Sequence, residues 1–354
     1  MSSYTIRDIA RLAGVSVATV SGVLNNKPTV KSALVERVKK AMDALDYHPD
    51  AVARSLRVGR TFTVGMIIAD VTNPFFTDVI RGVEKEAQAN GYSIILCDAN
   101  EDPSIERHYF STLSARRVDG VLLAPTRGPY VHESRRHKHF PIVLIDRVPL
   151  GFQGDAVLTD NFGAAYEGTR HLIGLGHRRI ATITGYLSLS NGLDRLEGFR
   201  KALQEEHLAL PDEYLQQGDF QVESGYRCGL KLLQLPVPPT AIFSSNNKMT
   251  LGLMRALREL GKSCPQQVSV LGFDDFEWSA YFTPQLSTIA QPAYEMGKIA
   301  MQILMQRLQA PADRQIDEKQ KMVRLKAELR IRESTAPPFV GATLLERDTS
   351  EVGT

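Results

Sequence analysis

Between residues 61 and 332 the sequence alternates between short apolar segments and amphipathic segments of helical period, in two successive series. The first series has strand-like segments at 63–69, 92–97, 118–124 and 142–146 and helix-like segments at 75–90 and 104–116. Strands that are apolar almost throughout are buried on both faces, as in parallel sheets covered by crossover helices. The first series therefore predicts a doubly wound parallel α/β lobe.

The second series begins after about residue 160 and has the same character. Its helix-like segments are 162–175, 193–206, 224–235, 249–260 and 293–308, and its strand-like segments are 179–184, 241–244 and 268–272. A last segment, 322–332, alternates apolar with charged residues, which predicts an edge or crossover strand with one solvated face. The two series together predict a two-lobed body, and a cleft between such lobes is a natural small-molecule site.

Polar residues follow many of the predicted strands, where the carboxyl ends of parallel strands meet at one edge. They include Asp70, Asn73, Thr126, Arg127, Asp146, Arg147, Asp160, Asn161, Asp194, Arg195, Asn246, Asn247, Asp274 and Asp275. Carboxylates, amides and guanidinium groups with aromatic rings nearby suit a polyhydroxylated ligand. Taken alone, an Asp at a strand end is more often a helix cap, but the repetition along one edge favours a binding cleft.

Residues 1–60 follow a different pattern, with three short helix-like segments. Thr5 and Asp8 form a capping signal, an apolar stripe of helical spacing follows, and Gly14 ends it. Ser16 then caps a second segment at 17–24, and two short helices joined by such a turn form a helix-turn-helix. A third amphipathic helix follows. A generic three-helix bundle is the alternative interpretation of this pattern.

The charge distribution favours nucleic-acid binding by this N-terminal segment. The whole chain carries a formal net charge of +2, which alone predicts no strong attraction to nucleic acid. Residues 1–60, however, contain ten Lys and Arg against five Asp and Glu, a net charge of +5, so the remainder carries −3. A small basic head on a mildly acidic body is therefore expected.

The motifs of the head resemble those of the lactose-repressor (LacI/GalR) family. Residues 5–21 read TIRDIARLAGVSVATVS, Val23-Leu24-Asn25 continues the match, and residues 47–56 read YHPDAVARSL, which is similar to the hinge helix of that family. The resemblance implies a helix-turn-helix domain at 1–49, a hinge helix and linker at 50–61, a periplasmic-binding-protein-like effector domain at 62–334 and a disordered tail at 335–354. It implies a sequence-specific transcriptional regulator that acts as a repressor.

The resemblance also implies which residues meet DNA. They are Thr5, Ser16, Val17, Ala18, Thr19, Ser21, Gly22, Asn25, Ala53, Arg54, Leu56 and Arg57. Val17 and Ala18 could contact a thymine methyl group but cannot form bidentate hydrogen bonds, and Gly22 stands where relatives often carry a base-reading side chain. Leu56 would wedge into the minor groove at the centre of a palindrome; packing at a domain junction is the alternative.

Motifs of the body extend the resemblance to about residues 4–333. They include TNPFF at 72–76, RVDG at 117–120, GHRRI at 176–180, RLEGF at 195–199, SSNN at 244–247 and LGFDD at 271–275. By position, the family's effector contacts correspond to Phe76, Arg195, Asn246 and Asp274, with Thr126, Asp146 and Phe220 as additions. Asn247 departs from the usual Asp. His177 lies in a loop before a strand and is interpreted as structural.

Signatures of other functional classes are absent from the sequence. There is no GxxxxGK[ST] phosphate loop, Gly-rich dinucleotide motif, GxSxG elbow or HExxH motif, and Cys97, Cys228 and Cys264 lack metal-ligand spacing. We therefore expect no enzyme activity, no cofactor and no metal site. A two-lobed solute-binding protein is the alternative function, but it predicts a signal peptide and no basic head.

The expected partners follow from the same reasoning. A palindromic operator implies a two-fold homodimer, with helix 75–90 as a candidate subunit contact. The effector could be a sugar, a sugar acid, a sugar phosphate or a nucleoside. The N-terminus lacks the apolar run of a signal peptide and no segment reaches the length of a membrane span, so a cytoplasmic location is expected.

Overall fold

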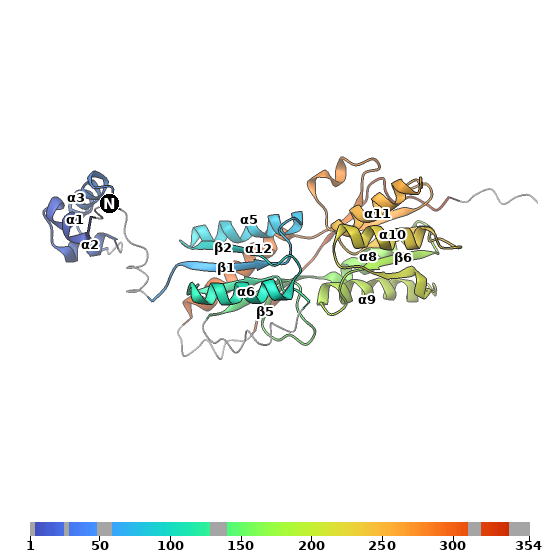
Figure 1. The fold of residues 1–354 in the computed structure, drawn as a ribbon, viewed down its shortest axis with the longest axis horizontal. Helices are drawn as coiled ribbons and strands as arrows, with labels where there is room; N and C mark the ends of the chain where they lie inside the picture. The colour runs from blue at the N-terminus through green and yellow to red at the C-terminus, as the bar shows by residue number, and fades with distance from the viewer. Residues whose placement is uncertain (1–3, 25–27, 48–58, 128–139, 311–319, 340–354) are drawn as a thin grey trace, which may run out of the picture. The chain divides into compact units, whose positions relative to one another are not determined.

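The computed structural model describes residues 4–24, 28–47, 59–127, 140–310 and 320–339. The chain divides into a head that ends at Phe62 and a body that begins at Thr63. Figure 1 shows the elements of both units.

The head contains the predicted helix-turn-helix. Its helices are α1 (Ile6–Ala13), α2 (Val17–Leu24) and α3 (Ser32–Ala44). The backbone N–H and hydroxyl of Thr5 both donate to Asp8 at the start of α1, at 2.9 and 2.7 Å. Gly14 ends α1 with a φ of 60°, in the left-handed region that glycine adopts without a Cβ clash. The Thr5–Asp8 bonds thus begin α1, and Gly14 ends it at the turn.

A small apolar core holds the three helices together. Ile9, Val20 and Val38 are fully buried, one from each helix. Arg37 of α3 reaches back to the turn and donates to the carbonyl oxygens of Ala13 and Gly14, at 2.7 and 3.0 Å. The short second helix, a poor helix former alone, is therefore stabilised by its neighbours.

Lobe 1 of the body is a six-stranded parallel sheet in the order β11-β5-β4-β3-β1-β2. Its strands are β1 (Thr63–Ile68), β2 (Ser93–Asp98), β3 (Gly120–Leu123), β4 (Ile142–Asp146), β5 (Asp155–Thr159) and β11 (Met322–Leu325). Its helices are α5 (Pro74–Ala89), α6 (Pro103–Ala115) and α12 (Ala293–Gln309), with α5 and α6 on opposite faces of the sheet in Figure 1. This confirms the predicted doubly wound architecture.

Lobe 2 is a second six-stranded sheet, in the order β12-β10-β9-β8-β6-β7, with only β12 antiparallel to its neighbour. Its strands are β6 (Ile180–Thr184), β7 (Leu215–Gln217), β8 (Ala241–Ser244), β9 (Ser269–Phe273), β10 (Ser287–Ala290) and β12 (Glu328–Arg330). Its helices are α8 (Asn161–Gly174), α9 (Ser190–Glu205), α10 (Val222–Leu233) and α11 (Asn247–Glu259), with short 3-10 turns at Asp212–Tyr214 and Glu277–Ala280.

Successive residues of the central strands enter separate cores on the two faces of lobe 2. Phe243 of β8 joins Phe199 of α9 in one core, whereas its neighbour Ile242 joins Leu253 of α11 in the other. Both faces of the strand are therefore apolar, which explains the continuous apolar segments in the sequence.

The chain crosses between the lobes three times, from β5 to α8, from β10 to α12 and from β11 to β12. The segment 322–332, predicted to be one edge or crossover strand, is split between the sheets, with β11 in lobe 1 and β12 in lobe 2. The helix at 293–308, which the sequence placed in the second series, is α12 and packs in lobe 1. Strands β5, β7 and β10 were not predicted.

The described residues just after the predicted end of the body pack against lobe 2. Residues 335–354 were expected to be a disordered tail, but Thr335 is buried and its hydroxyl lies 3.0 Å from His171 Nε2. The carbonyl oxygen of Ala336 lies 2.9 Å from Nε2 of the buried His177. The polar side chains at the base of lobe 2 thus fix this segment, which agrees with the structural role predicted for His177.

Candidate functional site

The head presents the beginning of α2 to solvent. Ser16, Val17 and Ala18 are exposed, and Val17 is an apolar side chain with 42% of its surface exposed. Ser16 caps the helix, since its hydroxyl accepts from the backbone N–H of Thr19 at 3.1 Å. The arrangement suits contact with base edges by the first turn of a recognition helix.

Other predicted DNA contacts are placed differently. Thr5 is exposed but is engaged with Asp8, and Thr19 and Ser21 are half-buried. Gly22 is buried, and a Cβ built on it would lie 2.9 Å from Val30 Cγ2, so position 22 faces the segment before α3. A larger side chain at position 22 would have to displace Val30, and the contact of this position with DNA stays a prediction. The remaining predicted contacts lie outside the described residues: Asn25, Ala53, Arg54, Leu56 and Arg57.

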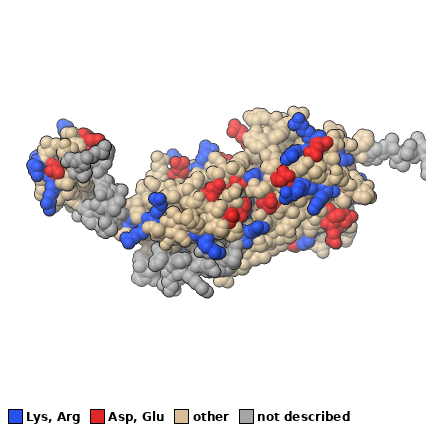
Figure 2. All heavy atoms as spheres, viewed as in Figure 1, with Lys and Arg blue, Asp and Glu red and all other residues tan. Residues whose placement is uncertain are grey.

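Figure 2 shows basic and acidic side chains on the faces of both units that are turned to the viewer. On the described part of the head, Arg7, Arg11, Lys31, Lys39 and Lys40 are exposed. Exposed cations are available for phosphate contacts, which supply most of the sequence-independent affinity for DNA.

A small cavity lies between the lobes of the body, at the carboxyl ends of the strands. Its lining comprises Asn73, Phe75, Phe76, Glu101, Asp146 and Arg147 from lobe 1, and Asn191, Arg195, Phe220, Asn246, Asp274 and Gln291 from lobe 2 and its crossover. Six of the seven predicted effector residues are therefore brought together. Thr126 is the exception: it is buried beside α6, where its N–H donates to Glu106 Oε2 at 2.6 Å.

Arg195 of α9 lies at the centre of this site, with its guanidinium 3.6 Å above the ring of Phe273. Its Nε donates to Asn161 Oδ1 at 2.7 Å and its Nη1 to the carbonyl oxygen of Ser245 at 2.5 Å. Nη2 is buried and has no hydrogen-bond partner among the described residues. A charged donor held in place and left unsatisfied is suited to bind a ligand oxygen.

Asp146, the last residue of β4, and Asp274, the residue after β9, occupy equivalent places in the two lobes. Both are in the left-handed region, with φ of 69° and 71°, a strained conformation for Asp that is typical of functional sites. Asp146 accepts from Asn191 Nδ2 at 3.2 Å, and Asp274 accepts from Gln291 Nε2 at 2.5 Å. Burial raises the pKa of Asp146 to about 6 and also raises the pKa of Asp274. These carboxylates retain lone pairs for ligand hydroxyls.

Two aromatic rings complete the lining. Phe76 is a buried residue of α5, and Phe220 follows β7 with a φ of 65°. A Cβ on Gly185 would lie 2.0 Å from Phe220 Cζ, so a glycine is needed where the far end of that ring approaches the backbone. Asn246 holds this loop, since its Nδ2 donates to the carbonyl oxygen of Phe220 at 3.0 Å while its Oδ1 caps α11. The rings can contact the apolar face of a sugar.

The lining also contains residues that were not predicted as effector contacts. Asn73 and Arg147 follow predicted strands, so their position at the strand ends was the signal that could have selected them. Glu101 lies in the loop after β2 and Asn191 in the first turn of α9, and neither directly follows a predicted strand. Gln291 follows β10, a strand that was not predicted, and its Oε1 accepts from Thr159 Oγ1 of another crossover at 2.5 Å.

Polar contacts join the lobes beside the cavity. Lys248 Nζ lies 2.5 Å from Asp70 Oδ2, 3.0 Å from Thr72 Oγ1 and 2.6 Å from Gln221 Oε1. Burial alone would raise the pKa of Asp70, but hydrogen bonds from Lys248 and Thr72 hold it below its ordinary value. We call these four residues the interlobe cluster.

A further contact between the lobes comes from Asn247. Its Nδ2 donates to Asn73 Oδ1 at 2.8 Å. The Asp usual in the family at this position would have no such donor. The departure from the family pattern therefore adds a link between the lobes and leaves the cap of α11 intact.

The free space of the cavity is about 20 Å³, which is room for about one ordered water. A second hollow, of about 470 Å³, is lined by Asn100, Glu101, Asp102, Pro103, Arg127, Tyr186 and Gln221. Glu101 lines both spaces. A sugar could enter the inner cavity only if the lobes or the lining side chains move apart.

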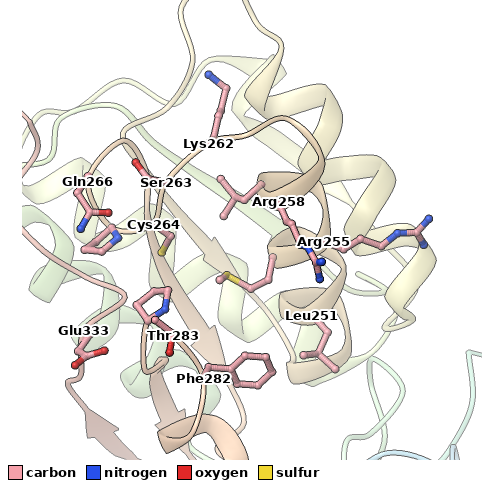
Figure 3. Close-up of a pocket in the computed structure, with 14 residues that line it drawn as sticks. Leu251, Arg255, Arg258, Lys262, Ser263, Cys264, Gln266, Phe282, Thr283 and Glu333 are labelled. Carbon is pink, nitrogen blue, oxygen red and sulfur yellow. The ribbon is translucent and has the colours of Figure 1, made fainter.

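A larger hollow, of about 860 Å³, lies on lobe 2 (Figure 3). It is bounded by the C-terminal half of α11 and by the loops at 262–266 and 282–284. It shares no residue with the inner cavity and contains no convergent set of carboxylates. Within the described residues no cluster of His, Cys, Asp and Glu could hold a metal ion, and no helix there is long and apolar enough to cross a membrane.

Comparisons with known proteins agree with this geometry. Residues 5–50 match the family described as bacterial regulatory proteins, lacI family, and residues 169–335 match a periplasmic binding protein-like domain. The chain is 38% identical to the ribose operon repressor of Escherichia coli K12, over 87% of this chain and 94% of that protein. It is also 38% identical to the HTH-type transcriptional repressor PurR of Vibrio vulnificus, over 86% and 92%.

Solved structures show the same architecture. The lac repressor dimer bound to operator and an anti-inducer matches with a TM-score of 0.82 and 26% identity, over 95% of this chain and 100% of that chain. A LacI family transcriptional regulator from Enterococcus faecium with bound ribose matches with a TM-score of 0.67 and 32% identity, over 78% and 99%.

Proposed function

Because the chain belongs to the lacI family of bacterial regulatory proteins, we propose that it represses transcription by binding an operator, under the control of a small molecule bound between the lobes of its body. The curated relatives it matches over most of its length are named as repressors. The alternative of a solute-binding protein is not favoured, because such a protein would have no use for the helix-turn-helix head.

We assign DNA recognition to the exposed start of α2. Ser16, Val17 and Ala18 would meet base edges and phosphates, with Thr19, Ser21 and Thr5 beside them and Asn25 at the end of the helix. A hinge at 50–61 would place Ala53, Arg54, Leu56 and Arg57 at the minor groove. A palindromic operator requires two heads, so the protein acts as a homodimer, in the cytoplasm with its DNA.

The lining of the cavity favours an uncharged sugar as the effector. Its carboxylates, Glu101, Asp146 and Asp274, outnumber its guanidinium groups, Arg147 and Arg195, which leaves a formal charge of −1 around the ligand. A sugar acid or a sugar phosphate would be repelled, whereas hydroxyl groups can both donate to carboxylates and accept from guanidinium groups. The convergence of Asp146, Arg195 and Asp274 beside two aromatic rings carries this proposal.

Control of DNA binding follows from the three crossovers. A sugar that bonds to Asp146 in lobe 1 and to Arg195 and Asp274 in lobe 2 binds one arrangement of the lobes more tightly than the others, and it can shift the equilibrium only by that difference in affinity. The arrangement of the lobes would then set the spacing of the two hinges in the dimer.

Thermal melts with a panel of pentoses and hexoses test the effector proposal. A sugar that binds the native state raises the melting temperature with its concentration, and Asp274→Asn should remove that rise while leaving DNA binding intact. If no neutral sugar raises the melting temperature, or if the rise survives in Asp274→Asn, the assignment of the cavity is wrong.

Selection of bound duplexes from a random pool tests the DNA proposal. A palindrome should emerge, and affinity should fall steeply as salt rises from 50 to 200 mM, as expected for about 6–10 phosphate contacts. Leu56→Ala should weaken the selected site more than a random duplex, because a minor-groove wedge acts only on the specific complex. Recovery of no common sequence would contradict sequence-specific binding.

A further inference from the structure

The inner cavity has a second polar wall, formed by Glu101 and Arg147 of lobe 1. Arg147 follows Asp146 at the end of β4, and its side chain is 2% exposed. Its Nη2 donates to Glu101 Oε1 at 2.8 Å, and the Glu101 side chain is 10% exposed. Both residues line the cavity. A buried ion pair is thus built into the site beside the carboxylates already described.

Each member of this pair keeps one unsatisfied atom. Arg147 Nε lies 3.8 Å from Asp146 Oδ2, beyond hydrogen-bond distance, and has no partner among the described residues. Glu101 Oε2 is likewise buried and without a partner there. Buried polar atoms are almost always satisfied in folded proteins, so an unsatisfied donor and an unsatisfied acceptor on one cavity wall require an explanation.

The backbone holds Glu101 in this position. Asn100 and Glu101 are both in the left-handed region, with φ of 47° and 56°. The N–H of Glu101 donates to the carbonyl oxygen of Ala69 at the end of β1, at 2.6 Å, and the N–H of Asp102 donates to that of Ala99 at 2.8 Å. These two strained residues, held by backbone hydrogen bonds on both sides, direct the carboxylate of Glu101 into the cavity. In an ordinary loop, a Glu side chain would be exposed to solvent.

Arg147 is held from the other side by lobe 2, since its guanidinium carbon lies 5.5 Å from the centre of the Phe220 ring. A group that pairs with Glu101 in its own lobe and faces an aromatic ring of the other lobe is not free to turn toward solvent. The position of its unsatisfied Nε is therefore fixed relative to the cavity.

We propose that Glu101 and Arg147 determine the specificity of the effector site by bonding two hydroxyl groups of an uncharged sugar. Arg147 Nε donates to the oxygen of one hydroxyl, and Glu101 Oε2 accepts from the other. This inference rests on the proposed function and extends the set of ligand contacts beyond Asp146, Arg195 and Asp274. The same inference explains why sugar acids would be rejected, because the unpaired Oε2 of Glu101 would repel the negative charge of a sugar acid.

Glu101→Gln tests this role with little change of shape. The ligands are the neutral sugar that stabilises the wild type most and its aldonic acid, each measured by isothermal titration calorimetry. Loss of a charged acceptor should weaken the neutral sugar roughly tenfold, and the uncompensated charge of Arg147 should tighten the acid, so the ratio of the two affinities should change by more than about tenfold. Arg147→Lys, which keeps the charge but lacks Nε, should weaken the neutral sugar without favouring the acid.

Glu106→Gln is the matched control. Glu106 is a buried carboxylate of α6 near the same arginine, but it accepts from the backbone N–H of Thr126 and does not line the cavity. Its ratio of affinities should stay within about twofold of the wild type. Melting curves of each variant without ligand show that it is folded.

The outcomes separate this inference from the proposed function. If Glu101→Gln and Arg147→Lys keep the wild-type affinities while Asp274→Asn loses the sugar, the sugar site stands and the specificity role is overturned. A shift in Glu106→Gln as large as that in Glu101→Gln also overturns it, because the effect would then be one of general charge. If the wild type binds none of the sugars, the proposed effector class fails, and this inference fails with it.

Discussion

Individual side chains at the strand ends are the part of the site that the sequence predicts best. Asp146 and Asp274 follow strands whose apolar pattern is plain, so their common edge could be inferred from the sequence alone. Thr126 also follows a strand, but its backbone N–H donates to Glu106 of α6. Thr126 is therefore buried between the sheet and that helix and does not face the cavity. Glu101 and Gln291 could not be predicted, because a strained loop and an unrecognised strand place them.

The raised pKa of Asp146 predicts a pH-dependent gain of stability in Asp146→Asn. Burial raises this pKa to about 6 in the folded protein, above the value of 3.8 for an ordinary Asp. The stability contributed by protonation is present below about pH 4 and is lost as the pH rises through 6. Asp146→Asn should therefore exceed the wild type by about 1–3 kcal/mol at pH 7.5, and Asn also tolerates a left-handed φ better.

Denaturant unfolding of both proteins between pH 5 and 8 measures this difference. The advantage of Asp146→Asn should shrink as the pH falls below 6, because the wild-type carboxyl is then neutral as well. Asp155→Asn serves as the contrast, since Asp155 is paired with Arg307 at 2.7 Å and should lose stability when neutralised. An advantage of Asp146→Asn that does not vary with pH would contradict the assignment of the pKa.

At the scale of elements, the sequence predicts whether a segment is a helix or a strand better than it predicts which sheet that segment packs against. The period of 293–308 identifies a helix, but nothing local reveals that α12 covers the sheet of lobe 1. The alternation of 322–332 is that of one strand, although the chain passes from one sheet to the other inside it. Strands β5 (DAVLT), β7 (LQQ) and β10 (STIA) begin or end in polar residues, so each contributes at most three successive apolar residues and merges with the loops around it.

The contact between α5 and α12 depends on two glycines. A Cβ on Gly82 would lie 2.0 Å from the carbonyl oxygen of Tyr294, and one on Gly297 would lie 2.0 Å from that of Val79. Because the atoms in the way belong to the backbone, the helices would have to separate. Gly82→Ala should therefore lower the free energy of unfolding by about 2–3 kcal/mol.

Gly174→Ala is the control for this prediction. Gly174 ends α8, and nothing lies within 4 Å of a Cβ built there. The substitution should leave stability unchanged or raise it by up to about 1 kcal/mol, through the lower entropy of the unfolded chain. Equal effects of the two substitutions in chemical denaturation would show that the close approach of the helices is not the cause.

At the scale of the whole molecule, the basic head and the two-lobed body follow from charge and periodicity, but the contacts between the lobes do not. The interlobe cluster pairs Asp70 and Thr72 with residues about 150 or more positions away in the chain. No short-range pattern contains such a pair. The chemistry of the lining was therefore predictable, whereas the small free volume of the cavity was not.

Lys248→Gln should shift the body toward an open arrangement of its lobes. The interlobe cluster joins the lobes without a ligand. The ammonium group of Lys248, whose side chain is 14% exposed, makes three of the hydrogen bonds in the cluster. Its loss should increase the radius of gyration of the ligand-free protein in X-ray scattering. The apparent affinity for the sugar should rise about two- to tenfold, because the arrangement described here has no room for a sugar and a larger fraction would be open to bind it.

Lys201→Gln provides the comparison within one lobe. Lys201 pairs with Glu205 on the surface of α9 at 3.1 Å, and the pair does not cross between the lobes. Its loss should change neither the scattering nor the sugar affinity. Unchanged scattering in Lys248→Gln, or the same change in both variants, would mean that the interlobe cluster does not set the arrangement of the lobes.

The threefold crossing of the chain also has a consequence for biosynthesis. Lobe 1 begins at β1 but receives α12 and β11 only after the ribosome has produced all of lobe 2 except β12. Until residue 309 emerges, the apolar surface that α12 will cover on β3, β4 and β5 stays open to water. The elements of lobe 2 lie in nearly one continuous stretch of the chain, so we expect lobe 2 to fold on the nascent chain before lobe 1 is complete. The incomplete lobe 1 would expose apolar surface during this time and would need a chaperone to protect it.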